Sequence, residues 1–252
     1  MHGGHPLVTV EADPVAVEAR LVGGGLSCPG CRAVLRPWGW ARPRSVHGLA
    51  GTLRPRRARC SGCLLTHVLL PVTVLLRRGY AAEVIGAALS GRAGGEGHRR
   101  IAGRLSVPAG TVRGWLRRVA GRLEPARQAF LQVAHRAAVD LRVPGSLGCR
   151  WRDLLAGLGA ATVAVTGRFG PVGVLGPVAA WQVAVACSGG RLLAPGWPAG
   201  GGQHELSLTR ADGAGNPREG HSRAPSGPRA PPLCEESRFR WWLHAIMSMT
   251  MR

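Results

Sequence analysis

CPGC, at Cys28–Cys31, is matched by a second pair of the same spacing, CSGC, at Cys60–Cys63. In a C-x2-C pair both thiolates can converge on one ion while backbone amides point at sulfur, and two pairs supply the four ligands of a tetrahedral site. Residues 32–59 form a longer spacer than the roughly 15–20 residues typical of such sites, but inserted hairpin length accounts for it. The cysteine pairs therefore predict one bound Zn²⁺.

The predicted ligands are Cys28, Cys31, Cys60 and Cys63. Four thiolates close the coordination shell, and no carboxylate stands between Glu18 and Glu83 to act as a general base, so a structural zinc ribbon is expected. His67, or less plausibly His47, is an alternative ligand. Incidental buried thiols and an iron–sulfur or redox role are the competing interpretations. Cys149, Cys187 and Cys234 are singletons, expected to be inert.

The charge of the chain is strongly positive. Its 252 residues carry a net charge of +20, and all 33 basic residues are arginine. An exclusive use of arginine indicates a GC-rich coding sequence, so the charge is more informative than the choice of residue. Such an imbalance favours a polyanionic partner, and nucleic acid fits best.

The N-terminus has no basic region followed by an apolar run, so we expect a reducing cytoplasmic location, associated with the nucleoid. The apolar stretch Leu154–Cys187 is interrupted by Arg168 and by glycines and prolines, which argues against a transmembrane helix. A membrane partner is therefore not expected.

Composition and periodicity predict a mainly α fold with a small β zinc ribbon. Short apolar bursts separated by Gly and Pro precede Arg77, and helical spacing follows it. Pro, Gly, Ser and Arg dominate after Pro195, which predicts disorder. The expected units are an N-terminal tail or short leading strand (1–20), the zinc ribbon (21–75), a helix-turn-helix bundle (76–140), an Ala-rich apolar helical pair (147–195) and a disordered tail (196–252).

The segment GHRRIAGRLSVPAGTVRGWLRRVA, residues 97–120, has the pattern of a helix-turn-helix. Ala102 is small where the two helices would cross, Val107 would fill the turn, and Val112 and Trp115 would hold the second helix to the first. Ser106 stands at a turn position where glycine is common because of its left-handed backbone. An ordinary amphipathic hairpin with a solvated arginine face is the alternative.

The second helix would expose a strip of Gly110, Arg113, Gly114 and Arg117, because these residues recur at helical spacing. Glycine allows close backbone approach to DNA, and arginine reaches guanine edges or phosphates. The predicted DNA-binding residues, from this strip, its flanks and the ribbon, are Arg54, Arg56, Arg57, Arg59, Arg99, Arg100, Thr111, Arg113, Arg117 and Arg118.

Residues 27–130 resemble the actinobacterial zinc-ribbon plus helix-turn-helix proteins, a family of unknown function similar to the DNA-binding front ends of insertion-sequence transposases. CPGC, WGWARPR, RPRRARCSGC, THVLLP and GHRRIAGRLSVPAGTVRGWLRR carry the resemblance. It implies DNA binding at mobile-element ends or a promoter.

The leading hypothesis is a zinc-stabilised, sequence-specific binder of double-stranded DNA without catalytic activity, associated with a transposase or regulating transcription. A second copy of the chain or a separate transposase chain is an expected further partner. The alternatives are a fragment or subunit of a transposase or recombinase, disfavoured by scattered carboxylates and a lone tyrosine, Tyr80, and an interaction or membrane-associated protein using residues 147–195.

Overall fold

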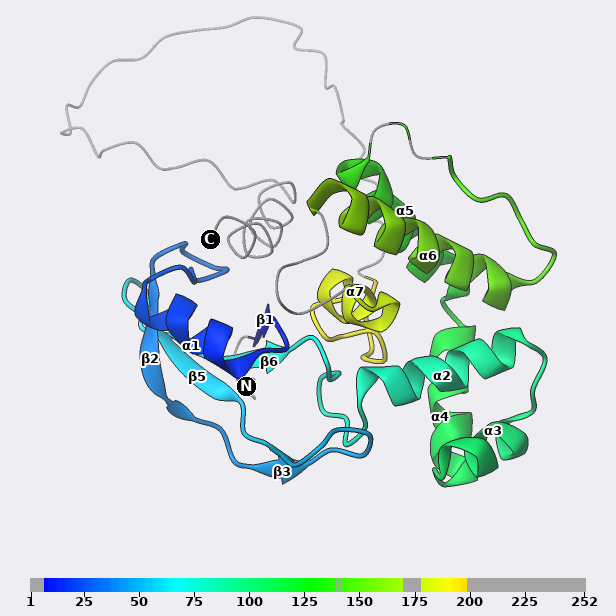
Figure 1. Ribbon diagram of the computed structural model, residues 1–252, viewed down its shortest axis with the longest axis horizontal. Coiled ribbons are helices and arrows are strands. Elements are labelled where there is room, and N and C mark those ends of the chain that lie inside the picture. Colours follow the sequence, from blue (N-terminus) through cyan, green and yellow to red (C-terminus); the bar gives the residue numbers. More distant parts are fainter. Residues whose placement is uncertain (1–6, 139, 141, 170–177, 199–252) are drawn as a thin grey trace, which may run out of the picture.

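The computed structural model describes residues 7–138, 140, 142–169 and 178–198. Within these residues the chain forms a mixed α/β fold in which a sheet unit precedes a helical unit (Figure 1). The expected order, sheet before helices, is found. The expected disordered tail, 196–252, lies almost entirely outside the described residues.

The sheet unit is built around one four-stranded sheet in the order β1-β6-β5-β2. β1 pairs parallel with β6, whereas β6–β5 and β5–β2 are antiparallel. β3 and β4 form a separate two-stranded ribbon. The strands are β1 (Leu7–Val10), β2 (Leu35–Trp40), β3 (Arg44–Ser45), β4 (Thr52–Leu53), β5 (Arg56–Cys60) and β6 (Thr66–Pro71).

Residues 1–20 were expected to form a tail or a short leading strand. For the described residues, 7–20, the prediction of a tail is wrong. β1 completes the sheet, and α1 (Pro14–Val22) follows it. The Asp13 side chain accepts a hydrogen bond from the Val15 amide at 2.9 Å and Pro14 opens the first turn, so the start of α1 is well capped. Figure 1 shows α1 lying across β2 and β5. These residues therefore belong to the sheet unit.

Among the described residues, the helical unit contains six helices that share one hydrophobic core. The expected helical pair at 147–195 is not a separate body, because α6 packs along α5 and α7 packs against α2 (Figure 1). The helices are α2 (Ala82–Ala93), α3 (His98–Leu105), α4 (Ala109–Ala120), α5 (Leu123–Ala137), α6 (Arg150–Phe169) and α7 (Ala180–Cys187). In the part of the chain that is described, none of them is long and apolar enough to cross a membrane.

Backbone hydrogen bonds join the two units at the segment before α2. Leu76 donates to the Gly190 carbonyl at 2.8 Å, and Ala81 donates to the His47 carbonyl at 2.8 Å. The Arg78 guanidinium adds a bond to the Leu193 carbonyl at 3.1 Å. The loop after β3 and the segment after α7 are therefore both anchored on this connection.

Trp181 of α7 lies directly against Gly86 of α2, and a Cβ on residue 86 would collide with the indole ring. Gly86→Ala should therefore lower the free energy of unfolding by about 1–3 kcal/mol through overpacking. Urea unfolding measures the change. Gly159→Ala in α6 is the matched control, since nothing lies within 4 Å of its added methyl group. The control should be neutral or stabilising by up to about 1 kcal/mol; equal losses in both variants would contradict the assigned contact.

Candidate metal centre and nucleic-acid interface

The four predicted cysteines converge at one end of the sheet. Their sulfur atoms all lie within 4.8 Å of one another, with Cys31 and Cys60 at 3.2 Å and Cys28 and Cys63 at 3.7 Å. Thiolates bound to tetrahedral zinc at about 2.3 Å lie about 3.8 Å apart, so the cluster matches the donor type and the size of a zinc site. The prediction of a four-cysteine site is confirmed as an arrangement able to hold a metal ion.

Each pair of cysteines lies in a tight turn of the same form. Cys28 donates its amide to the Ala33 carbonyl at 2.8 Å, and Cys60 donates to the Leu65 carbonyl at 2.9 Å. The residue after the second cysteine of each pair, Arg32 or Leu64, has a left-handed backbone with φ of 64° and 60° respectively. The two turns are thus local repeats that present thiols in the same way.

Gly62 is required where the two turns meet. A Cβ at this position would come within 2.8 Å of the Ala33 Cβ and 3.4 Å of the Cys31 sulfur. Beside it, the Ser61 amide donates to the Val34 carbonyl at 3.0 Å. The second turn can therefore lie against the first only because residue 62 has no side chain.

The surroundings of the cluster shift the pKa values of Cys60 and Cys63 in opposite directions. Burial raises the pKa of Cys60, but the Cys63 amide, the Cys31 thiol and the Gly62 amide outweigh burial and lower this pKa to about 6. The Leu65 amide lowers the pKa of Cys63, whereas burial and the surrounding thiols raise it to about 12. A divalent cation at the centre would allow all four sulfurs to ionise together.

His67 adjoins the cluster. Its side chain is fully buried, and its Nε2 lies 3.4 Å from the Cys28 sulfur. With Nε2 protonated it donates a hydrogen bond to that sulfur, so it supports a ligand without replacing one. His47, the other histidine considered from sequence, is exposed, and its ring lies tilted against that of Tyr80, with ring centroids 5.4 Å apart.

The ribbon arginines have distinct surroundings. Arg56 forms a bidentate pair with Glu18 of α1 at 2.7 and 2.9 Å and donates to the Gly39 carbonyl at 2.7 Å. The hydrogen bond from Arg56 lowers the pKa of Glu18 even though burial opposes it. Arg56 is therefore engaged within the fold, whereas Arg54 is exposed and Arg57 and Arg59 are half-buried on β5.

The predicted helical arginines are exposed. Arg99 and Arg100 lie on α3, and Arg113, Arg117 and Arg118 lie on α4. Thr111, also predicted, is half-buried. The structure thus leaves all five arginines at the surface of neighbouring helices.

Gly114 lies under the guanidinium of Arg118, where an added Cβ would be 3.0 Å from Nη1. Gly114, Arg117 and Arg118 line a shallow hollow of about 340 Å³. Burial and then Arg118 lower the pKa of two half-buried arginines, Arg78 and Arg122. The C-terminal half of α4 therefore lies in a concentrated positive field.

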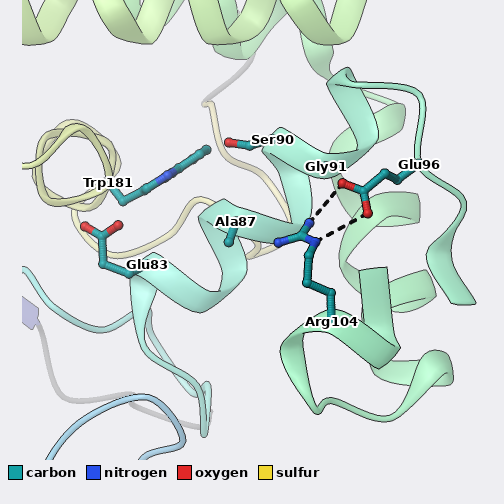
Figure 2. Close-up of a pocket in the computed structure, with 7 residues that line it drawn as sticks. All are labelled: Glu83, Ala87, Ser90, Gly91, Glu96, Arg104 and Trp181. Carbon is teal, nitrogen blue, oxygen red and sulfur yellow. Dashed lines mark hydrogen bonds and ion pairs between the residues drawn. The ribbon is translucent and has the colours of Figure 1, made fainter. Parts of the chain in front are cut away.

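Another hollow, of about 500 Å³, lies between α2 and α7 and was not foreseen from sequence (Figure 2). Glu83, Ser90 and Trp181 line it, together with an ion pair between Glu96 and Arg104 at 3.2 Å. Burial raises the pKa of Glu83. Trp181 reaches this hollow from a distant part of the chain, which local periodicity does not reveal.

Comparison of the chain with protein-family models, curated proteins and solved structures finds no match.

Cys60→Ser should abolish stoichiometric zinc binding and lower the thermal stability of the sheet unit, because it removes one of the four sulfur ligands. Metal content by elemental analysis and circular dichroism melting measure both effects. Cys149→Ser is the matched control, as Cys149 lies outside the cluster. Wild-type zinc content in Cys60→Ser would contradict the site.

His67→Leu should retain zinc but weaken its binding about 10- to 100-fold, because a donor to the Cys28 sulfur is lost. Competition with a chromophoric chelator measures the affinity. His47→Leu removes an imidazole outside the cluster and should leave the affinity unchanged. An unchanged affinity in His67→Leu would show that the Cys28 contact does not support the metal.

Proposed function

We propose that this protein is a zinc-stabilised, sequence-specific binder of double-stranded DNA with no catalytic activity of its own, acting as a transposase-associated factor or a transcriptional regulator. Zinc would hold the sheet unit together, and α3 and α4 would act as a helix-turn-helix. The exposed arginines of α4 around a glycine-lined hollow are the observation that carries the proposal.

The packing of α4 supports a role for its outer face. Val112, Trp115 and Val119 are buried in the helical core, which leaves Arg113 and Arg117 on the surface. Between α3 and α4, Ser106 adopts a left-handed backbone with φ of 53°, which sharpens the turn without a glycine. A helix held in this way can enter a major groove and present arginine to guanine edges.

Electrostatics supports the same partner. The chain carries a net charge of +20, and α4 lies beside further half-buried arginines at positions 78 and 122. Duplex DNA carries about one negative charge per 1.7 Å of helix axis, so it can neutralise this field with a gain in counterion entropy.

Arg113→Ala combined with Arg117→Ala should weaken duplex binding by about tenfold or more. The slope of the logarithm of the binding constant against the logarithm of the salt concentration should become shallower by about 1 for each lost phosphate contact. Selection from genomic fragments identifies the target, and fluorescence anisotropy at several salt concentrations measures affinity. Arg142→Ala removes an exposed arginine far from α4 in the chain and is the charge control.

If the double variant binds the selected duplex as tightly as wild type at every salt concentration, α4 is not the recognition helix. Equal weakening by Arg142→Ala would likewise contradict a dedicated role for α4, because it would show attraction by overall charge alone.

A further inference from the structure

The sheet has one face covered by α1 and one face that carries arginine. Ala58 and Cys60 of β5 are buried in the core beneath α1. Side chains alternate along a strand, so Arg57 and Arg59 point to the opposite face. Arg36 of β2 is the register partner of Arg59 and therefore shares its face.

Arg36 and Arg59 form a like-charged cross-strand pair. Directly opposed residues bring their Cβ atoms to about 4.5–5.5 Å, and like charges there are destabilising. No Asp or Glu occurs between Glu18 and Glu83, and within the described ranges neither arginine forms a salt bridge. An anion from outside the fold would remove this repulsion.

A tryptophan stands beside the pair. The register of β2 shifts between Pro37 and Gly39, and the residue at this bulge, Trp38, is 54 % exposed. The Arg59 guanidinium lies 4.5 Å from the centroid of the Trp38 ring and donates to the Leu64 carbonyl at 3.3 Å. The indole ring is thus held in place by a cation while much of its surface remains accessible.

We propose that Trp38, Arg36 and Arg59 form a platform for single-stranded DNA, in which an unpaired base stacks on Trp38 and the flanking phosphates pair with the two arginines. Aromatic rings that stack bases within a basic groove are the common chemistry of single-strand binding. A duplex hides the faces of its bases, so it would use the arginines but not the ring. The choice of DNA over RNA rests on the proposed function, whereas the platform itself rests on the strand register and the contact between Arg59 and Trp38.

The opposite face of the same strand provides an internal control. Trp40 is 46 % exposed, and its ring lies 4.6 Å from the guanidinium of Arg56. Arg56, however, is neutralised by Glu18 on the α1 side of the sheet. Trp40 therefore matches Trp38 in residue type, exposure and cation contact, but the arginine nearest its ring is neutralised, and the other cation over it, Arg54, lies farther away, 5.6 Å from the ring centroid.

The test uses the zinc-loaded full chain and a labelled oligothymidine, with binding followed by fluorescence anisotropy. Trp38→Ala should weaken binding roughly 5- to 150-fold, the loss of one stacked base, while Trp38→Phe keeps most of the affinity. Trp40→Ala should weaken binding less than Trp38→Ala, because Glu18 neutralises the arginine nearest the Trp40 ring and only the more distant Arg54 is left to hold a phosphate there. Zinc content and melting temperature equal to wild type show that each variant is folded. Combined Arg113→Ala and Arg117→Ala should leave oligothymidine binding unchanged, which separates this platform from α4.

Four results would overturn the inference. Wild-type affinity of Trp38→Ala for oligothymidine would remove the stacking role, and equal losses in Trp38→Ala and Trp40→Ala would remove the specificity for one face. A Trp38→Ala variant that loses affinity for a duplex as much as for the single strand would show a phosphate-binding surface instead. Tighter binding of oligouridine than of oligothymidine would assign the platform to RNA.

Discussion

The contact between the two cysteine turns is the constraint on which the sheet unit depends. The buried core beneath α1 is small, and a core of this size rarely suffices to order a unit without a crosslink or metal. The Cys31 and Cys60 sulfurs lie 3.2 Å apart across the junction, next to Gly62, whose missing side chain permits the approach. A metal at this point would tie the start of β2 to the end of β5 and so hold the register of the two strands that carry Arg36, Arg56, Arg57 and Arg59.

That register decides which charges are available. Leu35 of β2 lies opposite Cys60 at the end of the sheet that carries the cysteine cluster. Because side chains alternate along a strand, this register determines which face each β5 residue points to. Arg56 faces α1 and pairs with Glu18, so its charge is neutralised and the ion pair attaches the helix to the sheet. Arg59 faces the other way and contacts a tryptophan ring instead of a carboxylate. Within the RPRRAR segment, Arg56 is thus a structural cation and Arg59 is open to an external anion, and the alternation of side chains along β5 separates the two.

The parts of the fold that sequence could predict are those determined by local pattern. Two helices joined by a turn at Ser106 were predicted within residues 97–120, and α3 and α4 lie there, because apolar spacing is a local signal of helix. The four cysteines were found because their spacing encodes convergence. The helix α1 was missed, since only Val17 and Leu21 of its nine residues are buried and this short repeat is a weak periodic signal.

Features set by tertiary packing could not be read in the same way. The contact between Gly86 and Trp181 joins residues far apart in the chain. Such contacts place the Ala-rich helices in the helical core instead of leaving them as a separate pair. The bulge at Trp38 and the pairing of Arg56 with Glu18 depend on strand register and on α1. The sequence alone therefore could not distinguish ribbon arginines that pair within the fold from those that remain able to bind an external anion.

The distribution of unneutralised arginine links stability to binding. Arg36 opposes Arg59 in the sheet, and Arg118 lies near Arg78 and Arg122 in the helical unit, so each unit holds like charges close together. Such repulsion costs stability in the free protein and is relieved when a polyanion binds. Backbone bonds from the segment before α2 to His47 and Gly190 hold the two units together. A nucleic acid that contacts both units would therefore stabilise the whole fold more than it stabilises either unit alone.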